Sequence, residues 1–143
     1  MKYAFILGLS AFVLSACNTG QSNIDAEERK IEYAQFIDNP TELSFESMNF
    51  DFGKVKDGEI VEHTFKFKNT GDQTLILINV TGSCGCTVPQ EWPQYPIEPG
   101  GTGEIKVQFD STGRVGKVRK NVRVEANTNP TMSILNLTGE VTE

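Results

Sequence analysis

The chain has 143 residues, and its 13 lysines and arginines against 19 aspartates and glutamates give a formal net charge of −6 at pH 7. A hydrophobic fraction of 38% suffices for one packed core, so we expect a single folded domain and not a disordered chain. The acidic balance argues against nucleic-acid binding, because a phosphate backbone is attracted by a basic face.

Residues 1–16 have the pattern of an export signal. Lys2 supplies a positive charge, and residues 3–16 are nearly all apolar or small. A membrane-spanning helix needs roughly 20 apolar residues, whereas the apolar part of a signal peptide is shorter and ends in small residues. The segment ends in Leu14-Ser15-Ala16-Cys17, which resembles the bacterial lipobox. This resemblance implies cleavage before Cys17 and a lipid on its sulfur. The alternative is an ordinary signal peptide cleaved before a cysteine.

The lipid would anchor the protein in the bacterial cell envelope. Each buried CH₂ group of an acyl chain contributes about 0.8 kcal/mol, so two or three chains together hold durably. Asn18 stands where the inner-membrane retention signal has Asp, which favours the outer membrane, facing the periplasm or the cell surface. A lipid on Cys17 also reduces the odd count of three cysteines to an even two.

The segment after Cys17 predicts a tether and a short helix. Residues 18–23 are small and polar, as in a flexible linker. Residues 26–37 favour a helix that Asn39-Pro40 would end. Ile31, Ala34 and Ile37 form an apolar stripe on this helix. Two alternatives are open: the stripe docks on the domain, or the helix frays in solution. The chain thus divides into a signal peptide at 1–16, a lipidated cysteine with tether and helix at 17–41, and a folded domain at 42–143.

From residue 42 the pattern takes the period of two that is typical of strands. Val61, Phe65 and Phe67 share one face with His63, which predicts a half-buried antiparallel strand. The apolar run at 74–81 predicts a central strand. Further strands are predicted at 43–46, 49–52, 104–109, 116–126 and 132–141. About seven short strands within about 100 residues suit an all-β fold, an immunoglobulin-like antiparallel β-sandwich.

The sequence lacks the motifs of nucleotide and nucleophilic chemistry. It has no G-x-x-x-x-G-K-[ST] phosphate loop and no G-x-S-x-G elbow, and His63 is its one imidazole. We therefore expect a protein that is not an enzyme and that has no cofactor.

Cys84 and Cys86, separated by one glycine, form the one cluster that could carry chemistry. Three interpretations are open: a structural disulfide or buried thiols, an exchangeable dithiol, and a soft-metal site for which copper is the favoured ion. Zinc is poorly supported, since a closed structural site needs four ligands and His63 would add only a third. A lone histidine in an apolar row is more often packed than a ligand.

Five basic residues and no acidic one lie in the stretch from residue 114 to residue 123: Arg114, Lys117, Arg119, Lys120 and Arg123. Strand alternation directs Lys117, Arg119 and Arg123 to one outer face. They could be solvated cations that protect a sheet edge from aggregation. With Arg114 they could instead contact anionic headgroups or an acidic partner over the short range that screening permits.

Four stretches in combination resemble the DUF1573 family over about residues 48–143: Phe50–Gly58, His63–Gly71, Ser83–Thr87 and Ile97–Gly101. The resemblance implies an immunoglobulin-like sandwich akin to the ASPM/SPD-2/Hydin-type domains, in an exported bacterial protein that is often a lipoprotein. It implies no catalytic mechanism.

The sequence as a whole predicts a lipid-anchored, non-enzymatic interaction or assembly module of the envelope. Its expected partners are the membrane, through the N-terminal lipid, and an envelope protein. The alternative is a thiol-based redox or copper-binding envelope protein that uses Cys84 and Cys86.

Overall fold

A computed structural model describes residues 28, 31 and 33–143 of the chain. The export signal, the lipid on Cys17 and the tether lie outside the described residues, so these predictions stay predictions. In the described part of the chain, no helix has the length and apolarity needed to cross a bilayer.

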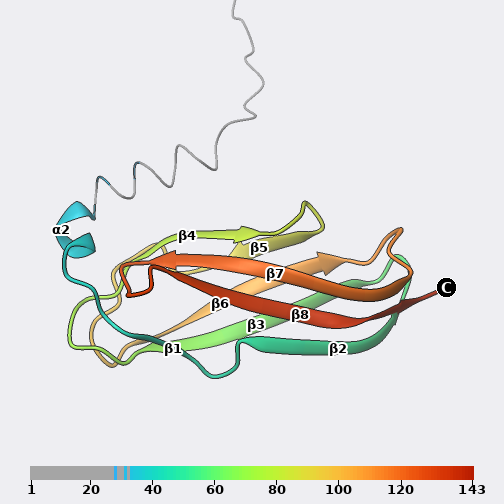
Figure 1. The fold of residues 1–143 in the computed structure, drawn as a ribbon, viewed down its shortest axis with the longest axis horizontal. Helices are drawn as coiled ribbons and strands as arrows, with labels where there is room; N and C mark the ends of the chain where they lie inside the picture. Colours follow the sequence, from blue (N-terminus) through green and yellow to red (C-terminus); the bar gives the residue numbers. More distant parts are fainter. Residues whose placement is uncertain (1–27, 29–30, 32) are drawn as a thin grey trace, which may run out of the picture.

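Two four-stranded sheets form the domain, with strand orders β1-β3-β6-β5 and β2-β8-β7-β4. Neighbouring strands are antiparallel, except for the parallel pair of β2 and β8. Figure 1 shows the two layers, with α2 at one end of the sandwich. The elements are α2 (Ala34–Ile37), β1 (Leu43–Phe45), β2 (Asn49–Lys56), β3 (Ile60–Asn69), β4 (Leu77–Gly82), β5 (Thr87–Glu91), β6 (Thr102–Asp110), β7 (Gly116–Ala126) and β8 (Met132–Thr142).

The predicted immunoglobulin-like β-sandwich is confirmed, with eight strands in place of about seven. The strand that the sequence pattern missed is β5, which contains Pro89. Proline has no backbone N–H to donate, so it is tolerated mainly at sheet edges. β5 is an edge strand that pairs only with β6, and its register shifts between Pro89 and Glu91. Because β5 has a strand partner on one side only, the missing N–H of Pro89 interrupts no second ladder of hydrogen bonds.

The prediction of a central strand at 74–81 is wrong, because β4 lies at the edge of its sheet. Its apolar run is nevertheless buried on both sides, with Leu77, Ile78 and Val80 only 2%, 4% and 6% exposed. A register shift between Leu77 and Asn79 disrupts the alternation there. A run of apolar residues reports burial on both faces, which an edge strand also has when neighbouring segments cover it.

β1 and β2 follow each other in the chain but belong to different sheets. β1 pairs with β3, and β2 pairs with β8. β2 also runs further than the predicted 49–52, because Gly53 adopts a φ of 69° and forms a bulge after which pairing resumes at Lys54. Phe50 and Phe52 point from β2 into the space between the sheets, where both pack on the core.

The core lies between the sheets and is apolar on both sides. The strand β3 contributes Phe65 and Phe67 as predicted, and each is at most 2% exposed. Other fully buried side chains of the central strands include Ile105, Val107, Phe109, Val122, Val124, Leu135 and Leu137. This core fixes the two outer faces and the loops at either end, where exposed functional groups can lie.

Polar contacts hold the helical segment before the domain. Asn127 donates through Nδ2 to the carbonyl oxygens of Phe36 at 3.0 Å and Thr74 at 2.9 Å. Ile31 is 72% exposed, and α2 has no buried residue. Of the two open alternatives, the last helical turn is docked, and of the stripe Ile31 and Ala34 are exposed while Ile37 is half-buried.

Candidate functional site

Cys84 and Cys86 are joined by a disulfide in the connection between β4 and β5. Their Cα atoms are 5.3 Å apart, within the usual range for a disulfide. This connection carries the chain from one sheet to the other, and in Figure 1 it lies away from the end that holds α2. Cys86 is only 7% exposed and belongs to the core, whereas Cys84 is partly buried at its margin.

His63 lies on the inward face of β3, as the alternation predicts, and its ring contacts are aromatic. It stacks on Phe50 with ring centroids 3.7 Å apart and meets the edge of Phe65 at 4.6 Å. Burial lowers the pKa of this imidazole from its usual 6.5. His63 is therefore packed as a neutral ring between the two sheets.

The residues proposed as soft-metal ligands are not gathered into one group. In residues 28, 31 and 33–143, no cluster of three or more His, Cys, Asp or Glu side chains could hold a metal ion. The two sulfurs bond to each other, and the His63 ring faces phenyl rings. Binding of copper to the two cysteines in reduced form stays a prediction.

The basic residues of β7 divide into two groups. Lys117, Arg119 and Arg123 are exposed on the outer face of the sheet, as predicted, and we call these three the β7 strip. Arg114 does not belong to the strip, because it lies in the turn before β7, where its Nε donates to the carbonyl of Asp110 at 3.3 Å. Lys120 lies on the opposite alternation of the strand and is half-buried.

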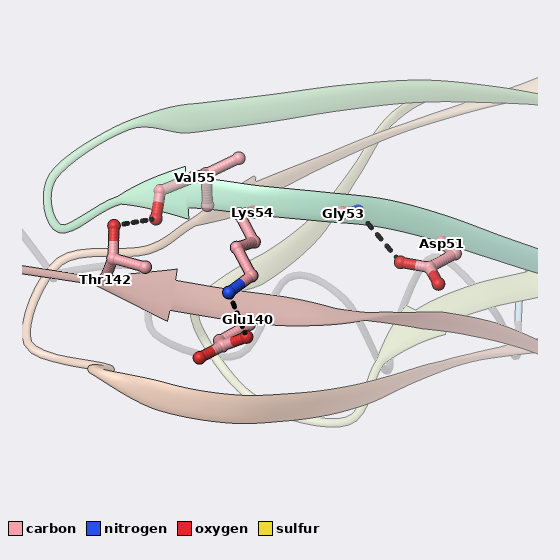
Figure 2. A network of polar contacts seen from close by, with 6 residues as sticks. All are labelled: Asp51, Gly53, Lys54, Val55, Glu140 and Thr142. Atoms are coloured by element: carbon pink, nitrogen blue, oxygen red, sulfur yellow. Dashed lines mark hydrogen bonds and ion pairs between the residues drawn. The ribbon is translucent and has the colours of Figure 1, made fainter.

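Acidic neighbours of the β7 strip already have partners. Glu140 on β8 lies between Lys54 and Lys117 in register, and its carboxylate pairs with Lys54 at 3.2 Å. Asp51 accepts a hydrogen bond from the backbone N–H of Gly53 at 2.8 Å. Figure 2 shows both contacts along β2 and β8. Within the described part of the chain, no carboxylate forms an ion pair with a cation of the β7 strip.

A hollow of about 490 Å³ lies on this outer face, where the bulge at Gly53 leaves a position without a side chain. Lys117 and Arg119 line one side of the hollow, and Asp51, Lys54 and Glu140 line the other. The sequence did not predict the contribution of β2 and β8 to this site. Parallel pairing joins strands that are far apart in the chain, and no local pattern reports that register.

A row of amides crosses the same face next to the hollow. Asn49, Asn136 and Asn121 lie in register on β2, β8 and β7, and Asn136 donates to Asn49 at 3.0 Å. The Oδ1 atom of Asn121 is buried and accepts no hydrogen bond from the described residues. The face next to the hollow is therefore polar.

Residues 43–141 match the family model described as "Protein of unknown function (DUF1573)". The chain belongs to the DUF1573 family. The match covers the sandwich from β1 to β8 and confirms the family that the sequence motifs indicated. A comparison with curated proteins finds no match.

Solved structures share the fold of this DUF1573 domain. The PapD-like domain 7 of human CEP192, an ASH domain, has a TM-score of 0.58 at 14% identity, covering 96% of this chain and 98% of its own. A protein of unknown function from Porphyromonas gingivalis W83 has a TM-score of 0.57 at 19% identity, covering 71% of this chain. The secreted serine protease VesC from Vibrio cholerae has a TM-score of 0.55 at 11% identity, covering 78% of this chain.

The chain spans 46% of the Porphyromonas protein and 25% of VesC. At these identities the likeness concerns the fold alone. It supports an immunoglobulin-like sandwich, and the role of that domain has to be argued from its surface.

Proposed function

We propose that this DUF1573 protein is a lipid-anchored, non-catalytic interaction module of the bacterial cell envelope. A lipid on Cys17 holds the chain on the outer membrane. The domain faces the periplasm or the cell surface. The sandwich binds an acidic segment of an envelope protein through the β7 strip. One observation supports this binding site: exposed cations lie beside a hollow whose carboxylates already have partners.

The charges favour this kind of partner, because Lys117 and Arg119 form no ion pair with the residues that the structure describes and so attract an anion without first breaking a contact. Lys117 and Arg119 point to solvent at the hollow, while Glu140 is held by Lys54 and Asp51 by the Gly53 N–H. An acidic segment that enters the hollow gains two charge-assisted contacts. The net charge of −6 makes this basic face a local exception on an acidic chain.

A protein partner fits the face better than a bare lipid surface does. Asp51 and Glu140 lie among the cations, so a uniformly anionic membrane would meet repulsion as well as attraction. A folded acidic partner can place its charges against Lys117, Arg119 and Arg123 alone. Anchoring also raises the effective concentration of one envelope protein around another, so a modest affinity suffices.

Reversing two charges of the β7 strip tests the proposal. Because like charges would then face the acidic partner, the double variant Arg119→Glu with Arg123→Glu should lower recovery of crosslinked partner from envelope extracts at least about tenfold. Wild-type recovery should fall as salt is raised, since the Debye length is about 8 Å at physiological ionic strength and shrinks with added salt.

The matched control reverses two exposed cations on the other sheet, Lys66→Glu with Lys68→Glu, and should keep recovery near the wild-type level. Liposomes with anionic lipids are tested in parallel as the competing target. If the β7 double variant binds both partner and liposomes as the wild type does, the strip is only solvated surface.

A further inference from the structure

The disulfide between Cys84 and Cys86 lies where the chain crosses from β4, an edge strand of one sheet, to β5, an edge strand of the other. β4 ends at Gly82 and β5 begins at Thr87, so the crossing consists of four residues. The bond closes a ring between residues only two apart in sequence. A ring this small removes little chain entropy from the unfolded state, so structural stabilisation is a weak explanation for it.

Backbone hydrogen bonds hold both flanks of the crossing independently of the sulfurs. The Ser83 N–H donates to the carbonyl of Asn121 at 2.8 Å, and the Asn121 N–H donates to the Ser83 hydroxyl at 3.2 Å. On the other flank, the Asp110 N–H donates to the carbonyl of Cys86 at 2.9 Å. Two thiols formed by reduction would therefore stay close enough to re-form the bond.

The two sulfurs differ in how accessible they are. Cys86 is 7% exposed and packs in the core, while Cys84 lies at the core margin. Gly85 between them is exposed, and no neighbouring atom lies within 4 Å of the place where its Cβ would be. An incoming thiol can therefore approach Cys84 over Gly85, whereas Cys86 is shielded. An accessible sulfur beside a buried one is the asymmetry that directed exchange requires.

We propose that Cys84 and Cys86 form a thiol–disulfide exchange site whose co-substrate is an exported dithiol reductant with a Cys-x-x-Cys pair. One thiolate of the reductant attacks the Sγ of Cys84, and a mixed disulfide forms while the Cys84–Cys86 bond breaks. Cys86 leaves as a thiolate and takes a proton. The second thiolate of the reductant then attacks the reductant's first sulfur in the mixed disulfide, so a disulfide forms within the reductant, and Cys84 leaves as a thiolate and takes a proton. Two electrons and two protons have then passed from the dithiol to this chain.

The full chain in its folded state provides the first test. Dithiothreitol serves as the dithiol, iodoacetamide traps free thiols, and mass spectrometry reads the peptide that contains both cysteines. Reduction should proceed without unfolding, with the fluorescence of Trp92 and the circular dichroism retained. Reduction that occurs only as fast as the chain unfolds would overturn the proposal.

Two variants of the full chain, each with one of the two domain cysteines replaced, test the asymmetry; Cys17 stays in both and is read on a separate peptide. With glutathione disulfide as the probe, Cys84 in the Cys86→Ser variant should form a mixed disulfide at least about tenfold faster than Cys86 in the Cys84→Ser variant. Equal rates, or a faster Cys86, would contradict the assignment of Cys84. The readout depends on neither lipid nor partner, so it fails or succeeds separately from the proposed interaction role.

Discussion

The imidazole of His63 joins the two sheets, because it belongs to β3 and stacks on Phe50 of β2. Both rings are flat and lie 6° from parallel, so the imidazole fills the space between the sheets as a phenyl ring would. The imidazole differs from a phenyl ring in one respect, since it can bind a proton. Burial lowers the pKa of His63, so the folded protein favours the neutral form.

This lowered pKa predicts an acid-sensitive stability. As pH falls below about 6.5, the unfolded chain binds a proton at His63 before the folded chain does, so the free energy of unfolding decreases. The decrease continues until pH reaches the folded-state pKa of His63. The variant His63→Phe keeps a stacked ring but cannot titrate, so it should lose less stability than the wild type between about pH 7.5 and pH 5.

Urea unfolding at several pH values measures this difference. His63 is the one histidine of the chain, so no second imidazole contributes in the same window. Hydrogen bonds from Thr112 lower the pKa of the Asp110 carboxyl below its usual 3.8, so any effect of that group appears only at more acidic pH. The same pH dependence in the wild type and in His63→Phe would contradict the prediction.

At the level of elements, the parallel pair of β2 and β8 shows how a glycine admits an aromatic ring. A Cβ on Gly139 of β8 would lie 2.2 Å from the nearest atom of the Phe52 ring. Phe52 also stacks on Phe109, with ring centroids 5.5 Å apart. Gly139 therefore leaves the space through which Phe52 attaches β2 to the core.

The variant Gly139→Ala should destabilise the domain by about 1–3 kcal/mol, because the added methyl group displaces the Phe52 ring from its place. The matched control is Gly85→Ala, whose added methyl group would meet no atom within 4 Å. It should change the free energy of unfolding by no more than about 0.5 kcal/mol. Chemical denaturation measures both variants, and equal losses would argue against the packing role of Gly139.

The sequence pattern predicts elements well where one face is buried and the other solvated. β3 and β7 follow this rule, and the inward placement of Phe65 and Phe67 and the outward placement of Lys117, Arg119 and Arg123 are confirmed. The pattern fails at two of the four edge strands, because β5 contains a proline and β4 is buried on both faces. Edge position depends on which strands pair, and pairing is a property of the whole fold.

Strand pairing also explains which residues of the candidate site could not be predicted from the sequence. The three cations of the β7 strip come from one strand, so their common direction follows from alternation alone. Asp51, Lys54 and Glu140 join them only through the parallel register of β2 and β8. The disulfide falls between these cases, because the spacing of Cys84 and Cys86 permits it without requiring it.

At the scale of the whole molecule, the proposed anchor and the sandwich can be separated by mutation. Replacing Cys17 by Ser removes the sulfur that a lipid would occupy, so the chain should accumulate as uncleaved or mislocalised precursor. Membrane partitioning of the chain, followed by fractionation and by the mass of its N-terminal peptide, measures the effect.

The control for this variant replaces Cys84 and Cys86 together by Ser, which leaves Cys17 in place. That double variant should partition into membranes as the wild type does, because the two cysteines lie in the folded domain. Unchanged partitioning of Cys17→Ser would refute the lipid anchor.

The place of β8 in its sheet has a consequence for how the chain folds. β8 is the last strand in chain order, yet it lies between β2 and β7. Until residues 132–142 have emerged, β2 lacks its sheet partner, and the apolar side of β2 with Phe50 and Phe52 has no completed layer to join. Contacts between such distant segments slow folding. The sheet of β2, β8, β7 and β4 therefore cannot be completed stepwise from the N-terminus, because β2 and β7 are joined only through the last strand of the chain.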